Sequence, residues 1–135
     1  MNQPTAYTKE YEQYLNNPET FWQKQASLID WYTEPKTILS KDSNDYFRWY
    51  ADGELNTSYL CLDYHVDQGR GEQLALIYDS PVTGQKLSFS YRKLRDQVAL
   101  FAGGLRDLGV AKGDRVIIYM SMVPEACLLY TSDAA

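Results

Sequence analysis

The pattern that most constrains the fold lies between residues 86 and 120. Apolar and polar residues alternate from Leu87 to Tyr91, which predicts a β-strand. From Leu94 to Leu108 the apolar residues recur at helical spacing, and Val116–Met120 is continuously apolar, as in a strand that is covered on both faces. Because strand, helix and strand in this order usually form a right-handed parallel unit, we expect an α/β fold.

Local signals agree with this order of elements. Ser90 is a candidate N-cap for the helix, and Gly109 is placed to end it in a left-handed conformation. Lys112–Asp114 predicts a turn, and Pro124 stands where another helix begins. Upstream, residues 74–78 read as a strand and 79–84 as a turn, so residues 74–91 are expected to form a β-hairpin.

The first 70 residues have a different character and predict a mostly helical, aromatic arm. We expect a frayed terminus over residues 1–7, a short helix over about 8–16, and a helix that Asn17 caps and that ends near Asp30. Residues 33–45 are polar and irregular, and 46–50 are rich in strand-forming residues.

One further helix is expected in this arm. Asn56 is its candidate N-cap, and its apolar stripe runs from Leu55 through Tyr59 and Leu62 to Val66, ending before Gly69.

Composition excludes several classes of function. The chain has 135 residues with a formal net charge of −5 and no strong cluster of Lys or Arg, which argues against nucleic acid or membrane as partner. Two cysteines and one histidine make a zinc site a poor expectation. The N-terminus resembles neither a secretory signal nor a transit peptide, so a cytoplasmic location is expected.

Candidate chemical sites are few, and the structural interpretation of each is favoured. Gly103–Gly104 lies inside the predicted helix, and the Gly109–Gly113 loop leads into a strand, so neither predicts a phosphate site. Asp63 and His65 stand two residues apart on a predicted helix and would point in different directions, so His65 is expected at a helix surface or end.

Four further residues are candidates, and a structural interpretation accounts for each. Cys61 is expected to be half-buried beside the apolar stripe. Asp114 and Arg115 are as well explained by a turn and a solvated strand start as by a function. Arg48 among aromatic residues is expected to stack on a ring, as a structural contact.

Several segments together resemble the short-chain acyl-CoA synthetases (acetyl- and propionyl-CoA synthetases) of the adenylate-forming, AMP-binding superfamily. The resembling segments are Phe21-Trp22 with Ile29-Asp30-Trp31, Trp49 to Asn56, Cys61 to His65, Leu87 to Leu94 and Gly109 to Ala126. Their order and spacing make the resemblance specific over residues 7–126. Residues 75–84 look more like the propionyl than the acetyl enzymes. The sequence departs from the family pattern at Leu60, Tyr64 and Ser121.

The resemblance implies an enzyme that joins propionate, or next acetate, to AMP using Mg-ATP and then transfers the acyl group to CoA. It implies an acetyl-CoA-synthetase-type N-terminal region over residues 1–70 and the start of an AMP-binding domain over 71–126. The family's phosphate loop, metal and ribose ligands, lysine and CoA arginines have no counterpart here. We therefore expect no catalytic, cofactor-binding or metal-binding residue in this stretch, no binding of Mg-ATP or CoA, and no activity of these 135 residues alone.

Residues 127–135 do not follow the family pattern and resemble translated sequencing-adapter DNA. We expect them to be a non-native tail of a truncated gene prediction. The aromatic arm is expected to pack onto a larger body outside this stretch, because its helices have apolar stripes but few partners here. A rival hypothesis stays open, in which the chain is a small non-enzymatic binding module that uses its aromatic arm as an interface. A dinucleotide-binding domain would need a glycine fingerprint that this sequence lacks.

Overall fold

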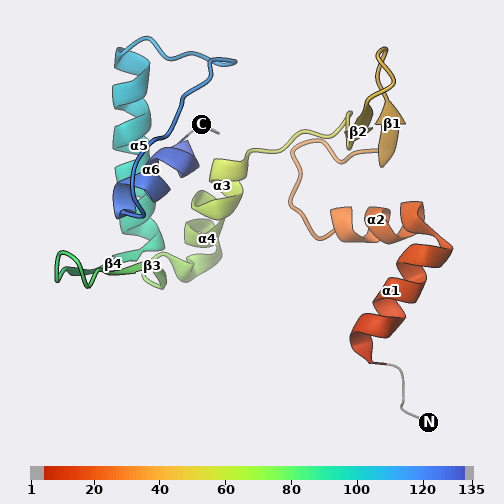
Figure 1. Ribbon diagram of the computed structural model, residues 1–135, viewed down its shortest axis with the longest axis horizontal. Coiled ribbons are helices and arrows are strands. Elements are labelled where there is room, and N and C mark those ends of the chain that lie inside the picture. The colour runs from red at the N-terminus through yellow and green to blue at the C-terminus, as the bar shows by residue number, and fades with distance from the viewer. Residues whose placement is uncertain (1–4, 133–135) are drawn as a thin grey trace. The chain divides into compact units, whose positions relative to one another are not determined.

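The computed structural model describes residues 5–132, which form two compact units, one up to Leu55 and one from Asn56 (Figure 1). Residues 1–4 of the expected frayed terminus and 133–135 of the expected tail lie outside the described residues. The two units are described separately below.

Unit 1 begins with two helices, α1 (Ala6–Asn16) and α2 (Pro18–Ala26). The Thr5 side chain caps α1 by accepting from the Thr8 N–H, so this helix starts two residues before the expected Thr8. Asn17 caps α2 as predicted, accepting from the Thr20 N–H. Helix α2 ends at Ala26 instead of near Asp30. Beyond Ala26, the N–H groups of Leu28 and Ile29 donate to the carbonyl three residues back, not four as in an α-helix.

Two short antiparallel strands complete unit 1. They are β1 (Leu39–Lys41) and β2 (Phe47–Trp49), with Ser40 opposite Arg48. The predicted strand is therefore confirmed as β2, whereas its partner β1 lies in the stretch that we expected to be irregular. The turn between them places Asp45 at φ 64°, a left-handed conformation that Asp tolerates better than most residues.

Unit 2 begins with three short helical pieces in place of the single helix that we predicted. They are α3 (Thr57–Cys61), α4 (Asp63–His65) and the π-helical turn η1 (Val66–Arg70). Asn56 caps α3 as expected. The helix breaks at Leu62, whose φ and ψ of −127° and −71° are not helical, and this residue is only 2% exposed. The break accompanies the burial of Leu62 in the core. The prediction of one continuous helix from Asn56 to Gly69 is therefore wrong.

A β-hairpin and a long helix follow. Strand β3 (Leu74–Asp79) pairs with β4 (Lys86–Ser90), with an irregularity between Leu74 and Leu76, which confirms the predicted hairpin. Helix α5 (Tyr91–Asp107) is capped by the Ser90 hydroxyl, which accepts from the Lys93 N–H. Gly109 follows α5 with φ 92°, as predicted for a left-handed helix end.

The predicted second strand of the α/β unit is absent from the described residues. Val116–Met120 forms no ladder with another strand, and Ile117 and Tyr119 are 91% and 99% exposed. An apolar parallel strand is stable only where neighbouring strands pair with it and both of its faces are covered. Within the described residues no strand pairs with this segment. The observed architecture is mixed helices with two small antiparallel sheets. Helix α6 (Pro124–Ser132) then begins at Pro124 as expected.

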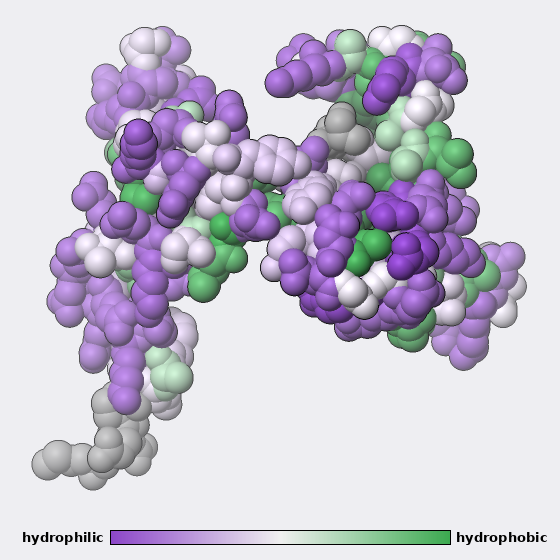
Figure 2. Space-filling view, turned by 180° about the vertical axis from the view of Figure 1, so that it is seen from behind, coloured by the Kyte–Doolittle hydropathy of each residue, from purple (hydrophilic) through white to green (hydrophobic). Residues whose placement is uncertain are grey.

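The core of unit 2 is built from the break at Leu62 and from residues of β3, β4, α5 and α6. Leu62, Phe89, Leu94 and Val98 are buried together, and Ala75, Leu76 and Leu128 pack against them. The predicted stripe of α5 is confirmed at Leu94 and Val98, whereas Leu108 is 83% exposed. Figure 2 shows that hydrophobic side chains also reach the surface among the hydrophilic ones.

Candidate functional site

The two tryptophan-bearing segments of unit 1 contact each other. The Trp22 and Trp49 ring centroids are 5.5 Å apart in an edge-to-face arrangement. The Tyr50 hydroxyl donates a hydrogen bond of 3.3 Å to the Trp22 carbonyl oxygen. Aromatic pairs of this geometry stabilise a fold beyond the area that they remove from water. These segments, which are 27 residues apart, therefore serve packing.

Trp31 makes the second link between the same parts of the sequence. Its Nε1–H donates to the Ala26 carbonyl oxygen at 2.8 Å, and its ring lies 5.6 Å from the Tyr50 ring. Gly53 lies directly under this indole, since a Cβ at position 53 would stand 2.9 Å from Trp31 Cζ3 and 3.1 Å from Pro35 Cβ. The segment needs glycine here because any larger residue meets the ring.

Two aspartates organise the loops of unit 1. The Asp52 carboxylate accepts from the Lys36 and Thr37 backbone N–H groups at 3.1 and 3.2 Å. The N–H of Thr37 is the main reason that the pKa of Asp52 lies below its ordinary value. These bonds are structural, and sequence reasoning missed them because the partners are 15 and 16 residues away.

Asp42 plays the same part in the β1–β2 turn. Its carboxylate accepts from the Asn44 and Tyr46 backbone N–H groups, and chiefly the Asn44 bond lowers its pKa. Arg48 forms an ion pair with Asp42, with Nη2 2.9 Å from Oδ2. The expected stacking of Arg48 on an aromatic ring is therefore wrong, because the nearer carboxylate takes the guanidinium.

In unit 2, His65 lies at the end of α4, as predicted. Its ring packs against the Tyr91 ring with centroids 4.4 Å apart and a tilt of 53°, and its Nδ1 contacts Arg70 Nη2. Partial burial, followed by the charge of Arg70, lowers the pKa of His65 below its ordinary value. The structure pairs His65 with these two residues and not with Asp63, so it assembles no catalytic dyad.

Arg92 forms a further contact that sequence reasoning missed. Its Nε donates to Glu72 Oε1 at 2.8 Å, and its backbone N–H donates to the Gly71 carbonyl oxygen. Its guanidinium lies 2.7 Å from where a Cβ of Gly71 would stand. The glycine therefore allows the arginine to lie across the loop between η1 and β3.

Gly103, Gly104 and Asp114 have the structural roles that the sequence predicted, whereas Cys61 differs from its prediction. Gly103 and Gly104 lie within α5 and are exposed, and Asp114 closes a turn by accepting from the Ala111 N–H at 2.8 Å. Cys61 is exposed, not half-buried as predicted, because it ends α3 immediately before the break at Leu62.

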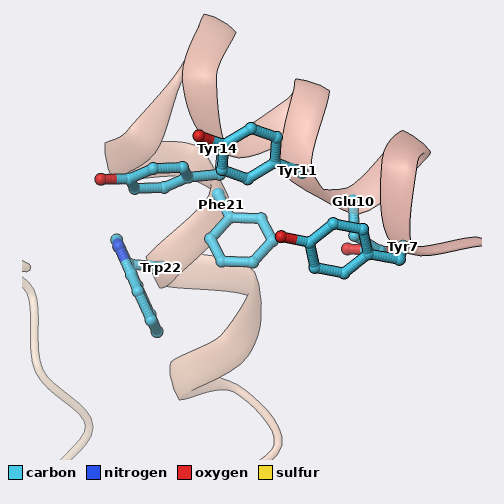
Figure 3. Close-up of a pocket in the computed structure, with 6 residues that line it drawn as sticks. All are labelled: Tyr7, Glu10, Tyr11, Tyr14, Phe21 and Trp22. Carbon is cyan, nitrogen blue, oxygen red and sulfur yellow. The ribbon is translucent and has the colours of Figure 1, made fainter.

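One open groove in unit 1 is lined almost entirely by aromatic rings, and we call it the aromatic groove (Figure 3). It lies between α1 and α2 and has a volume of about 380 Å³. Its lining residues are Tyr7, Glu10, Tyr11, Tyr14, Phe21 and Trp22.

Within residues 5–132, no three His, Cys, Asp or Glu side chains gather as a metal site would require. No helix in this described part of the chain is both long and apolar enough to cross a bilayer.

Comparison with known proteins gives the family. Residues 63–132 match the model of the AMP-binding enzymes, which covers more than half of the chain. The chain belongs to the AMP-binding enzyme family. Residues 7–61 match the model of the acetyl-coenzyme A synthetase N-terminus, so the chain carries both parts in the order that the resemblance implied. The predicted boundary after residue 70 stays a prediction.

Individual relatives agree with this membership. The chain is 52% identical over 123 residues to an uncharacterized protein of Pseudomonas aeruginosa, covering 91% of this chain and 20% of that protein. It is 42% identical over 128 residues to acetyl-coenzyme A synthetase of Salmonella typhimurium, covering 93% and 20%. It is 40% identical over 127 residues to human acyl-CoA synthetase short-chain family member 3, mitochondrial, covering 94% and 18%. The chain thus spans about a fifth of the length of these relatives.

The described residues do not fit the Mg-ATP that the family implies. Four described glycines have positive φ: Gly69 lies inside η1, and Gly84, Gly109 and Gly113 lie in turns. None of the four is followed at once by an α-helix whose amide groups would face a phosphate. We therefore derive no catalytic step from these residues.

Proposed function

We propose that this chain is the N-terminal region of an ATP-dependent short-chain acyl-CoA synthetase. The complete enzyme would join a short-chain carboxylic acid to AMP with release of pyrophosphate, and CoA thiol would then displace AMP to give acyl-CoA. The observation that carries the proposal is that two family models, one of them specific to acetyl-CoA synthetases, follow each other over residues 7–61 and 63–132.

We propose propionate as the preferred acid, with acetate next. The support is the resemblance of residues 75–84 to the propionyl enzymes. These residues form the end of β3 and the exposed turn before β4, where Gly84 takes φ 68°. The support for propionate is therefore a likeness of sequence in this hairpin, and not a contact of these residues with the acid.

The described residues would act as scaffold in the complete enzyme. The family segments of unit 1 are linked to each other by the Trp22–Trp49 and Trp31–Gly53 contacts. In unit 2, His65 of one family segment packs against Tyr91 of another. In the complete domain we expect Val116–Met120 to become a core strand, and we expect the enzyme to be cytoplasmic.

The test is an assay of the complete protein encoded at this locus. We expect acyl-CoA and pyrophosphate to form with propionate, less efficiently with acetate, and in a manner that depends on both ATP and CoA. Acetate used as well as or better than propionate would refute the propionate preference alone. No acid-dependent pyrophosphate release from the folded complete protein with any acid of two to four carbons would refute the synthetase function.

A further inference from the structure

We propose that Asp52–Gly53 is a site of isoaspartate formation that the contacts of unit 1 protect and that local opening of the unit exposes. In this reaction the Gly53 nitrogen bonds to the side-chain carboxyl carbon of Asp52, and a five-membered succinimide forms. The N–H proton and the carboxyl hydroxyl leave together as water. A second water opens the ring at the main-chain carbonyl, so the peptide then runs through Cβ and Cγ of residue 52 and the mass is unchanged. The proposal does not rest on the proposed synthetase function.

The sequence makes this pair the most reactive aspartate in the chain. Asp52–Gly53 is the one Asp-Gly step among the 135 residues, and there is no Asn-Gly step. Glycine has no side chain to shield its nitrogen, and it lets the backbone turn into conformations that other residues resist. In an unfolded chain we therefore expect this aspartate to cyclise before the others.

The fold holds the carboxyl group by both of its oxygens. The Lys36 N–H donates to Oδ2 at 3.1 Å, and the Thr37 N–H donates to Oδ1 at 3.2 Å. Accepting N–H bonds favours the ionised form of a carboxyl group, and the pKa of Asp52 is lowered chiefly by the bond from Thr37. Ring closure expels the hydroxyl and therefore needs the protonated acid, which these bonds disfavour.

The attacking nitrogen is held as well. The Gly53 N–H donates to the Tyr50 carbonyl oxygen at 3.0 Å. The next residue, Glu54, exchanges two backbone hydrogen bonds with Thr33, at 3.0 and 3.1 Å. On its open side Gly53 meets the Trp31 indole, 2.9 Å from where a Cβ would stand. Cyclisation must turn this peptide toward the Asp52 side chain, so these contacts must break first.

The reaction is therefore controlled by local opening of unit 1. A modification that occurs only in an open state proceeds in proportion to the fraction of molecules that are open. The product also hinders reclosing, because isoaspartate adds one methylene to the main chain and attaches the carboxylate directly to Cα. The carboxylate then falls short of the Lys36 and Thr37 N–H groups, and Gly53 is displaced from the Trp31 indole.

The experiment incubates the 135-residue chain at about pH 6 and measures isoaspartate at residue 52 by peptide mapping, which separates the two isomers of equal mass. The reference is the peptide acetyl-Trp-Tyr-Ala-Asp-Gly-Glu-Leu-Asn-amide, which has the sequence of residues 49–56. Trp31→Leu uncovers Gly53, and Lys36→Pro removes the N–H that donates to Oδ2, whereas the matched control Lys36→Ala keeps it. Every sample is measured again in unfolding urea.

We expect isoaspartate to form about tenfold or more slowly in the chain than in the peptide, as for a site that is open in less than about a tenth of the molecules. Trp31→Leu and Lys36→Pro should react faster than Lys36→Ala, and all rates should converge in urea. A chain that reacts as fast as the peptide, a slow rate that persists in urea, or no difference of either variant from Lys36→Ala would overturn the proposal. An isomerised chain with the melting temperature of the parent would overturn the claim that the product hinders reclosing.

Discussion

Replacing Gly53 with alanine tests whether the tryptophan-bearing family segments form a packed unit. The added Cβ would stand 2.9 and 3.1 Å from Trp31 Cζ3 and Cε3, and 3.1 Å from Pro35 Cβ. The indole has little freedom to move away, because its Nε1–H donates to the Ala26 carbonyl oxygen at 2.8 Å. Its ring also rests against Tyr50.

Overpacking of this kind destabilises a fold by about 1–3 kcal/mol. For a small domain, each kcal/mol of destabilisation lowers the melting temperature by roughly 4–8 °C. The assay is thermal and denaturant unfolding of the 135-residue chain, followed by tryptophan fluorescence. We expect the variant to unfold earlier and its tryptophan emission to shift, since Trp31 must move.

Two controls isolate the steric cause. Gly103→Ala places a Cβ in open space on α5, so it should stabilise its helix by about 0.5–1 kcal/mol. In a Trp31→Leu background the cost of Gly53→Ala should shrink, because two of the three atoms that the new Cβ meets are gone and only Pro35 Cβ remains. A Gly53→Ala chain as stable as the parent, or an equal cost in both backgrounds, would refute the reasoning.

Two further predictions concern one unit each. Leu94→Ala should destabilise unit 2 by about 2–5 kcal/mol, because Leu94 is only 4% exposed. Leu100→Ala on the same helix should change stability by less than about 0.5 kcal/mol, because Leu100 is 78% exposed. Equal midpoints of urea unfolding for the two variants would contradict the assigned core. Folding lowers the pKa of Asp52. The ionised side chain therefore stabilises the folded state at pH values above its unfolded pKa of about 4, and this stabilisation is lost as the pH falls through its folded pKa. Acidification from about pH 5 to 3 should therefore destabilise the parent more than Asp52→Ala, and parallel pH profiles of the two melting temperatures would refute this role.

The sequence predicted the elements that local signals determine. Caps at Asn17, Asn56 and Ser90 lie where they were expected, because a cap depends on bonds to residues two or three positions away. The β3–β4 hairpin was also predictable, since turn residues and alternation stand side by side in the sequence.

The errors arose where distant contacts decide the structure. The helix breaks at Leu62 because burial against Phe89 and Leu94 outweighs the helical pattern of its neighbours. Val116–Met120 carries the pattern of a buried strand, but a strand needs pairing partners that the pattern alone does not supply. The Asp52 bonds and the Trp31–Gly53 contact were also missed, since they join residues that lie 15 to 22 positions apart.

The central claim is that the described family segments pack the protein and do not carry its chemistry. ATP–pyrophosphate exchange by the purified 135-residue chain tests this most directly, with the complete enzyme as positive control. We predict propionate- and acetate-dependent exchange with the complete enzyme and none above background with this chain. Acid-dependent exchange by the 135 residues alone would contradict the account, because it would require a catalytic site among residues assigned here to packing.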